Sequence, residues 1–205
     1  PTYHTHSTTV DQMKKLLLLV LLILIGCSEP GPINMDKMLI KRDDIYYTKD
    51  TNQPYSGPTF TLYENGQYRN ILHLKDGKLD GTIMKYYENG QISVQMSVEN
   101  GIENGPVQSY YENGQLKMEG TWKDGKEDGP VQSYYENGKL EQKGTFKNGE
   151  WDGPYKYYHD NGQLKMEDTW KDGKQEGLQK SYDYNGQLER EETYKDGELI
   201  DVKEY

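Results

Sequence analysis

The sequence predicts an all-β fold, a single elongated and twisted antiparallel β-meander built from six hairpin repeats of 24 residues. Three features of the chain predict it. An Asn-Gly pair recurs every 24 residues, a second turn pair (Asp-Gly or Asn-Gly) follows each of them eleven residues later, and a third glycine marks every unit. The first pairs begin at Asn65, Asn89, Asn113, Asn137, Asn161 and Asn185. Because repeat units stack on their neighbours, function is expected on an extended surface.

The two turns of each unit delimit two strands whose pairing depends on the length of the first turn. In the unit 105–128, two runs of strand length are separated by Glu-Asn-Gly. A two-residue Asn-Gly loop would pair Tyr111 with Leu116, whereas a three-residue loop closed by a left-handed glycine would pair Tyr110 with Leu116. We favour the three-residue loop, because it places a slot that is tyrosine in five consecutive units beside an apolar series.

Two rows of aromatic side chains are candidates for a binding surface or for the core. The first row consists of Tyr86, Tyr110, Tyr134, Tyr158 and Tyr182. The second row lies further along the second strands and consists of Trp122, Phe146, Trp170 and Tyr194. Regular alternation predicts both rows on one face, opposite a polar face. We favour a core role, because few other apolar residues are available to bury, and a ligand site is the alternative.

The N-terminal segment predicts export to a membrane. Residues 1–12 lack any pattern and precede the first methionine, so we interpret them as an upstream extension that is not native. Residues 13–26 combine two lysines with a ten-residue apolar run, which is typical of a signal peptide and too short to span a bilayer. The run ends in Leu-Ile-Gly followed by Cys27, the only cysteine, and this resembles a bacterial lipobox. The resemblance implies lipidation of Cys27, and Ser28 favours the outer membrane; an ordinary signal peptide is the alternative.

The remaining boundaries follow from composition. Residues 27–36 are expected to form a tether, and residues 37–56 an N-terminal cap with a short strand at 45–48. The repeat array occupies 57–200, and the charged residues 201–205 form a C-terminal cap.

Composition excludes several classes of partner. The formal net charge of −10 repels phosphate backbones and anionic headgroups, so nucleic acid is not expected to bind. Hydrophobic residues make up only 33% of the chain, but 19 tyrosines in strict register indicate a folded array and not disorder.

Catalytic chemistry is not indicated. The chain lacks the nucleophile and phosphate-loop motifs of common enzymes, so no catalytic residue and no cofactor is assigned. His159 occupies a slot that is tyrosine in other units and is interpreted as a structural substitution. The spacing of the acidic residues at the second turns matches neither the EF-hand loop nor the nonapeptide calcium repeat, so no metal site is assigned.

Paired aromatics, Asn-Gly-Gln-Leu segments and Lys-Asp-Gly turns recur along the chain. In these features the chain resembles the bacterial variant of the MORN repeat. The best copies are 110–129 and 134–153, and the resemblance covers about 43–200. It implies an interaction or scaffold module without an active site. Proteins of this type in the YwqK-like family are labelled antitoxins, which implies a cytoplasmic partner, whereas the export signal here indicates the cell envelope.

The expected function is therefore that of a lipid-anchored scaffold of the bacterial cell envelope whose sheet binds another protein. A module that binds cell-wall glycan through the aromatic rows is the alternative. An antitoxin is the third interpretation. Fold alone does not name the partner.

Overall fold

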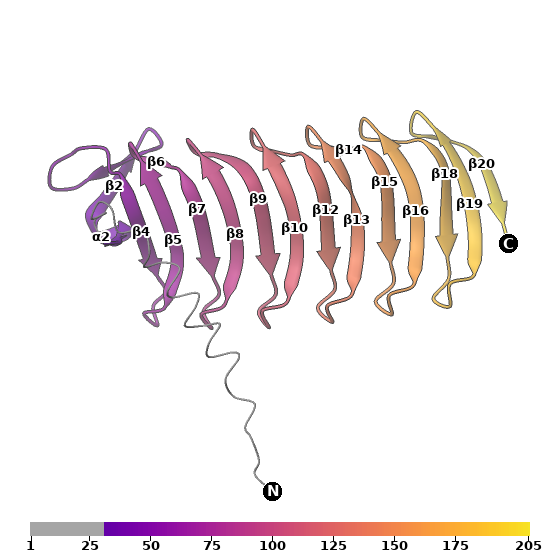
Figure 1. Ribbon diagram of the computed structural model, residues 1–205, viewed down its shortest axis with the longest axis horizontal. Coiled ribbons are helices and arrows are strands. Elements are labelled where there is room, and N and C mark those ends of the chain that lie inside the picture. The colour runs from indigo at the N-terminus through magenta and orange to yellow at the C-terminus, as the bar shows by residue number, and fades with distance from the viewer. Residues whose placement is uncertain (1–30) are drawn as a thin grey trace, which may run out of the picture. The chain divides into compact units, whose positions relative to one another are not determined.

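The computed structural model describes residues 31–205, and its array belongs to a compact unit, Pro32–Tyr205. The predicted extension, signal peptide and lipidation site at Cys27 lie outside the described residues. The array is an open antiparallel meander of repeated hairpins, which confirms the predicted fold class (Figure 1). No helix in the described part of the chain is long and apolar enough to cross a membrane.

Each unit contributes two long strands to an 18-stranded sheet. The first long strands are β4 (Gly57–Leu62), β7 (Gly81–Tyr86), β9 (Ile102–Tyr110), β12 (Gly129–Tyr134), β15 (Gly153–Tyr158) and β18 (Gly177–Tyr182). The second long strands are β5 (Tyr68–Lys75), β8 (Ile92–Glu99), β10 (Leu116–Lys123), β13 (Leu140–Lys147), β16 (Leu164–Lys171) and β19 (Leu188–Lys195). Short strands follow the second turns at β6 (Lys78–Leu79), β11 (Lys126–Glu127), β14 (Glu150–Trp151) and β17 (Lys174–Gln175), and β20 (Glu198–Glu204) ends the sheet.

The first turn of each unit is the predicted three-residue loop. In the third unit the Tyr111 N–H donates to the Gln115 carbonyl (2.8 Å) and the Gly114 N–H donates to the Tyr111 carbonyl (2.9 Å). Gly114 has a φ of +84°, which a side chain would strain. The loop pairs Tyr110 with Leu116, which confirms the predicted register.

The second turn is tighter and links neighbouring units. Asp124 and Gly125 both have positive φ (51° and 78°), as a two-residue type I′ turn requires, and Lys123 pairs with Lys126 across it. The Gly125 N–H donates to the Glu103 carbonyl of the preceding unit (2.9 Å). Equivalent bonds recur between the other second turns, so this margin of the sheet is held together by backbone hydrogen bonds.

The prediction that both aromatic rows share one face is wrong, because a bulge interrupts the alternation. Leu116 pairs with Tyr110, but Met118 pairs with Ser109, which leaves one extra residue in β10. Beyond this bulge the side chains of β10 have exchanged faces. The side chains of Trp122 and Tyr110 therefore point to opposite faces of the sheet. The same shift occurs in the other units.

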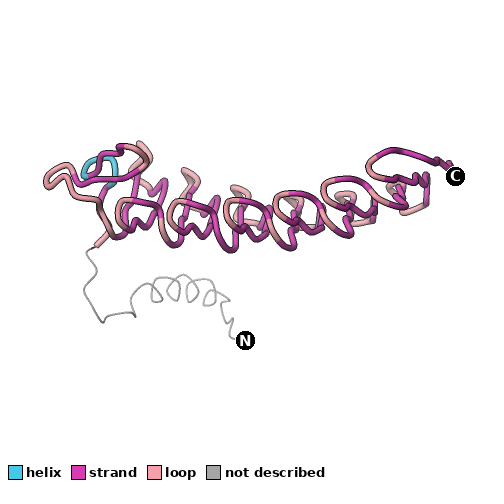
Figure 2. The backbone as a smooth tube through the Cα atoms, turned by 90° about the horizontal axis from the view of Figure 1, so that it is seen from above, coloured by secondary structure: helices cyan, strands magenta, loops and turns pink. Residues whose placement is uncertain are grey.

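We name the two faces by the rows they carry. The tyrosine face carries the row at Tyr86, Tyr110, Tyr134, Tyr158 and Tyr182, and the tryptophan face carries the row at Trp122, Phe146, Trp170 and Tyr194. Seen from above, the strands are bowed (Figure 2). All buried side chains within the array, polar and apolar, lie on the tryptophan face: Thr59, Thr61, Leu74, Ile83, Val98, Val107, Val131, Ser133, Asp168, Gln179 and Glu192. The core is therefore one surface of a single sheet.

The N-terminal residues cover the beginning of this core. Strand β1 (Ile33–Asn34) pairs in parallel with β4, and helix α2 (Met35–Met38) follows it. Strands β2 (Leu39–Arg42) and β3 (Ile45–Thr48) form a separate hairpin, in which β3 matches the short strand expected there. Met35 and Leu39 pack with Leu74 in a buried cluster. Part of the segment expected as a tether, 33–36, is thus ordered by burial of Met35.

Candidate interaction surface

The tyrosine face is a regular lattice of rings and polar side chains. The Tyr134 hydroxyl shares its one proton between Glu119 Oε1 of the preceding unit (3.1 Å) and Gln132 Oε1 (3.3 Å). Tyr182 donates in the same way to Glu167 Oε1 (3.0 Å). Burial, followed by these carboxylates, raises the pKa of both tyrosines, so they remain hydrogen-bond donors at neutral pH. The row is half-buried, and the hydroxyls of Tyr134 and Tyr182 tie their units to the preceding ones, whereas the Tyr110 hydroxyl bonds to Gln108 of its own unit.

Two shallow hollows recur on the tyrosine face at equivalent positions. The first is about 330 Å³ and its side chains on this face are Pro106, Gln108, Glu119, Thr121, Pro130 and Gln132. The second is about 180 Å³ and is lined in the same slots, two units later, by Pro154, Lys156, Glu167, Thr169, Leu178 and Lys180. At about 4.8 Å between strands, two units separate the hollows by roughly 20 Å. The tyrosine face therefore presents a hollow at equivalent repeat positions at two places along the array.

The chemistry and the volume of the hollows change along the array while the repeat positions that line them stay the same. Gln108 and Gln132 in the first hollow are replaced by Lys156 and Lys180 in the second. Lys156 Nζ lies 3.0 Å from Glu167 Oε2, and this hydrogen bond lowers the pKa of the Glu167 carboxyl. The C-terminal hollow is thus charged with both signs, whereas the N-terminal hollow is mostly neutral.

The second aromatic row is half-buried on the tryptophan face, and one of its members, Phe146, packs against other rings. Phe146 stacks on Trp151 with ring centroids 3.9 Å apart, and Trp151 meets Tyr155 edge to face at 4.9 Å. Burial, with nearby Asp168 as the next cause, raises the pKa of Tyr155 to about 12. Contacts of this kind occupy ring surface that a ligand would need.

Sequence reasoning missed a buried polar network on the tryptophan face of the last two units. Asp168 is only 6% exposed and accepts hydrogen bonds from Trp170 Nε1 (2.9 Å) and Gln175 Nε2 (3.1 Å). Gln179 Nε2 donates to Glu192 Oε2 (2.8 Å), which extends the network to the last long strand. A signal in the sequence was available, because Asp168 and Glu192 stand at a repeat position that is glycine in the two preceding units and Leu72 or Met96 in the first two.

A second ladder of hydrogen bonds runs beside the first turns. Tyr87 and Tyr111 donate their hydroxyls to the carbonyls of Tyr110 and Tyr134 in the following units, both at 2.7 Å. His159 takes the same place, with Nε2 lying 3.1 Å from the Tyr182 carbonyl oxygen. Because a carbonyl only accepts, this nitrogen carries the proton, and the imidazole replaces a phenol in a structural ladder.

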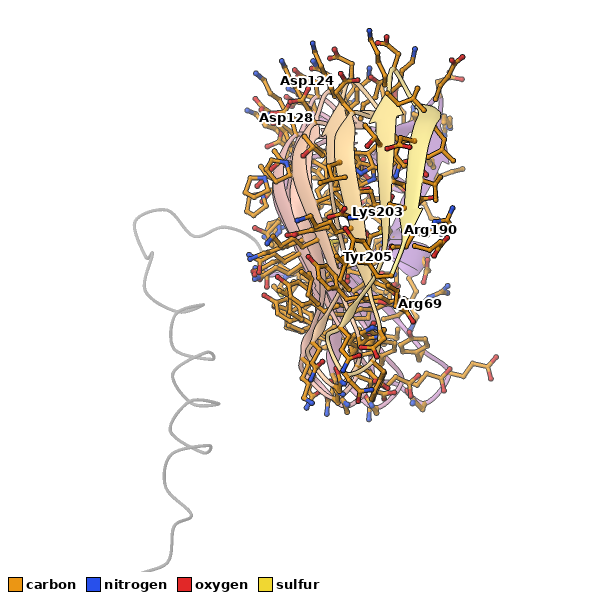
Figure 3. All side chains as sticks on the ribbon, turned by 90° about the vertical axis from the view of Figure 1, so that its right-hand side faces the viewer. Arg69, Asp124, Asp128, Arg190, Lys203 and Tyr205 are labelled. Carbon is orange, nitrogen blue, oxygen red and sulfur yellow. The ribbon has the colours of Figure 1, made fainter. Side chains whose placement is uncertain are left out.

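Acidic side chains at the second turns serve the backbone. Asp128 Oδ2 accepts the Asn148 N–H of the next unit (3.1 Å), and both Asp124 and Asp128 lie at the margin of the sheet (Figure 3). Among residues 31–205 no group of three or more His, Cys, Asp or Glu side chains is placed to hold a metal ion.

The model of the MORN repeat variant family matches residues 79–100, 103–124, 127–148, 151–172 and 175–196. These segments cover more than half of the chain. The chain belongs to the MORN repeat variant family. Each matched segment of this MORN repeat variant protein begins in the residues after one second turn and ends in the next, so it contains one complete first turn. The first hairpin, β4–β5, lies outside the match but has the same register shift.

Other comparisons add little to the family assignment. No curated protein matches this MORN repeat variant protein. A similar solved structure is that of a GtfA/B complex bound to UDP and GlcNAc, with 9% sequence identity and a TM-score of 0.23. The alignment covers 68% of this chain and 27% of that one. A likeness at this TM-score carries no argument about fold or function.

Proposed function

We propose that this MORN repeat variant protein is a non-catalytic scaffold of the bacterial cell envelope that binds another protein through its tyrosine face. The observation that carries the proposal is the recurrence of one hollow, slot for slot, at two places along this face. A sheet that repeats a hollow at the same repeat positions offers two linked contacts to one extended partner, and linked contacts gain affinity through effective concentration.

The composition of the hollows favours a protein over a glycan. Proline, threonine, glutamine and paired charges line them, and no aromatic side chain of the tyrosine face is among the residues that line either hollow. The hydroxyls of Tyr134 and Tyr182 are engaged by Glu119 and Glu167, and the tryptophans lie on the other face. Mixed apolar and polar surface of this kind is typical of protein interfaces.

The test places bulk in both hollows without touching the core. Thr121 and Thr169 are exposed equivalents on the tyrosine face, so Thr121→Arg with Thr169→Arg fills both sites. We expect the double variant to fold and to lose capture of the envelope protein that wild type retains from detergent-solubilised membranes. Thr51→Arg, at an exposed position in the N-terminal cap, is the matched control and should retain it.

The outcome separates the alternatives. Equal capture by the double variant and wild type would reject the tyrosine face as the binding surface. Retention of wild type on insoluble cell-wall polysaccharide, lost in the double variant, would replace the protein partner by a glycan.

Anchoring is tested separately at the N-terminal segment. The proposal places acyl chains on Cys27, because several chains hold a protein firmly where one chain binds marginally. A Cys27→Ser variant is expected to leave the membrane fraction. If it sedimented with membranes as fully as wild type, lipid anchoring at Cys27 would be rejected.

A further inference from the structure

The last strand of the sheet presents an open edge. Strand β20 pairs with β19 on one side, and no strand among residues 31–205 pairs with its other side. It exposes Leu199, Ile200 and Val202 at 47%, 61% and 41%. At the other end of the sheet, β1 pairs with part of β4. The two ends of the array thus differ, and open, partly apolar edges are templates for another strand.

The hydrogen bonds of β20 fix which backbone groups face outward. The Tyr205 N–H donates to the Glu189 carbonyl of β19 (2.9 Å). The N–H and C=O groups of successive residues alternate in direction along a strand. The backbone N–H and C=O groups of Lys203 and Asp201 therefore also point toward β19. The N–H and C=O groups of Val202 and Glu204 therefore point to the open side.

We propose that a second copy of this chain adds to this edge, with two β20 strands antiparallel about a two-fold axis at Val202. Val202 then exchanges two backbone hydrogen bonds with Val202 of the second copy, because both present outward groups. Asp201 lies directly opposite Lys203 of the second copy, and this pair occurs twice. Both residues lie on the tyrosine face, opposite Thr193 and Glu191 of β19, and Lys203 is labelled in Figure 3.

Charge selects this register over its neighbours. An axis at Asp201 would set Asp201 against Asp201 of the second copy, and an axis at Lys203 would set lysine against lysine. Like charges directly opposite destabilise a pair of strands. If the pairing of the two β20 strands shifted by a single residue, backbone N–H and C=O groups that point outward on one strand would face residues whose groups point toward β19 on the other. The strand is self-complementary in one arrangement, and a two-fold contact of this kind closes at a dimer.

The test exchanges the charges in the full-length chain, with self-association measured by sedimentation in a neutral detergent. We expect wild type to dimerise, and Lys203→Asp and Asp201→Lys each to weaken the dimer about tenfold, because two attractive pairs become repulsive. The double variant that carries both changes should regain wild-type affinity. Lys171→Asp, at an exposed position beside a second turn and away from the edge, is the matched control and should leave the affinity unchanged.

Mixing the two single variants provides an independent readout. In the heterodimer, aspartates at 201 and 203 of one chain face lysines at 203 and 201 of the other, so an equimolar mixture should dimerise where each variant alone does not. Because the mixture contains both altered strands, rescue shows that each remains docked on β19. A monomeric wild type, a dimer that is equally tight in both single variants, or a mixture without rescue would overturn the proposal.

Discussion

Asp168 shows how one residue can change the character of a repeat slot. Its counterparts Gly120 and Gly144 leave room for a neighbouring tryptophan ring, whereas Asp168 fills the space with a carboxylate. Trp170 and Gln175 donate hydrogen bonds to it, which offsets part of the cost of burying a charge. A repeat position can thus exchange a glycine for a buried carboxylate when the neighbouring side chains change with it and supply hydrogen bonds.

The pH dependence of Asp168 follows from its burial. Burial raises the pKa of Asp168, and the two hydrogen bonds partly oppose the rise. Since the folded pKa is the higher one, Asp168 favours folding where it is protonated and loses this contribution as the pH rises through the folded pKa. Asp168→Asn should therefore increase the free energy of unfolding at pH 7, and the increase should vanish below about pH 4. Urea unfolding across this range measures it.

The matched control for Asp168 is Asp172→Asn, an exposed turn residue whose slot is asparagine in other units. Its effect should stay within about 0.5 kcal/mol at each pH. A gain for Asp168→Asn that grew as the pH fell would contradict the expected sign.

The ladder beside the first turns predicts a cost for each lost hydroxyl. Tyr111→Phe removes the bond to the Tyr134 carbonyl (2.7 Å) and should lower the free energy of unfolding by about 1 kcal/mol. Tyr184→Phe removes a bond to Asp160 at a residue that is 55% exposed, and should cost about 0.5 kcal/mol or less. Thermal unfolding of both variants compares them, and equal losses would contradict a role for burial.

At the scale of the strand pair, the bulge after the first turn decides which face each side chain joins. Without it, Trp122 and Tyr110 would share a face, and the other face would carry Val107 among polar side chains. With it, the strand pair buries valine and half-buries tryptophan and phenylalanine on one face and leaves the tyrosine lattice on the other. The bulge thus separates the core from the candidate binding surface.

Close packing on the tryptophan face predicts a large effect from a small substitution. A Cβ at Gly144 would lie 2.6 Å from Trp151 Cζ3 and 3.2 Å from Tyr155 Cδ2. Gly144→Ala should therefore reduce the free energy of unfolding by about 1–3 kcal/mol through overpacking. Lys143→Ala, next to it on the opposite face and exposed, should change it by less than about 0.5 kcal/mol. Chemical denaturation distinguishes the two, and a neutral Gly144→Ala would show that the rings move aside.

At the scale of the whole array, identical backbone bonds join each unit to the next. The second turns are linked from Gly77 to Gly197, and the first turns by the tyrosine ladder. Stability is then close to a sum over units and the contacts between neighbouring units. A protein of this kind tolerates changes in length that keep the period.

Deletion of 105–128, one whole unit, is the test at this scale. We expect the shortened chain to keep its β-sheet circular dichroism and its cooperative unfolding. Its denaturant m-value should be lower by about one sixth, because the surface area exposed on unfolding scales with the number of units. Deletion of twelve residues, 117–128, removes one strand and reverses the direction of every later strand, so it should abolish cooperative unfolding. Equal behaviour of the two deletions would contradict a unit-by-unit array.

Much of the fold could be predicted, because each turn depends on local chemistry. Gly114 and Gly125 have positive φ, as their turns require, and the length of the three-residue loop is enough to pair Tyr110 with Leu116. The candidate site was harder. The tyrosine row was identified, but the hollows beside it depend on proline, threonine and glutamine slots from three strands, which carry no signal until the register is known.

The sequence by itself determined the period, the turn types, the strand pairing next to the first turn and the family. These follow from glycine and asparagine at fixed spacing, whose backbone preferences act within a few residues. Only the tertiary structure decided which face each aromatic row joins, where the N-terminal residues pack and which edge stays open. A bulge adds one residue without changing the pattern of letters, and burial of Met35 or exposure of Val202 depends on neighbours that are distant in the chain.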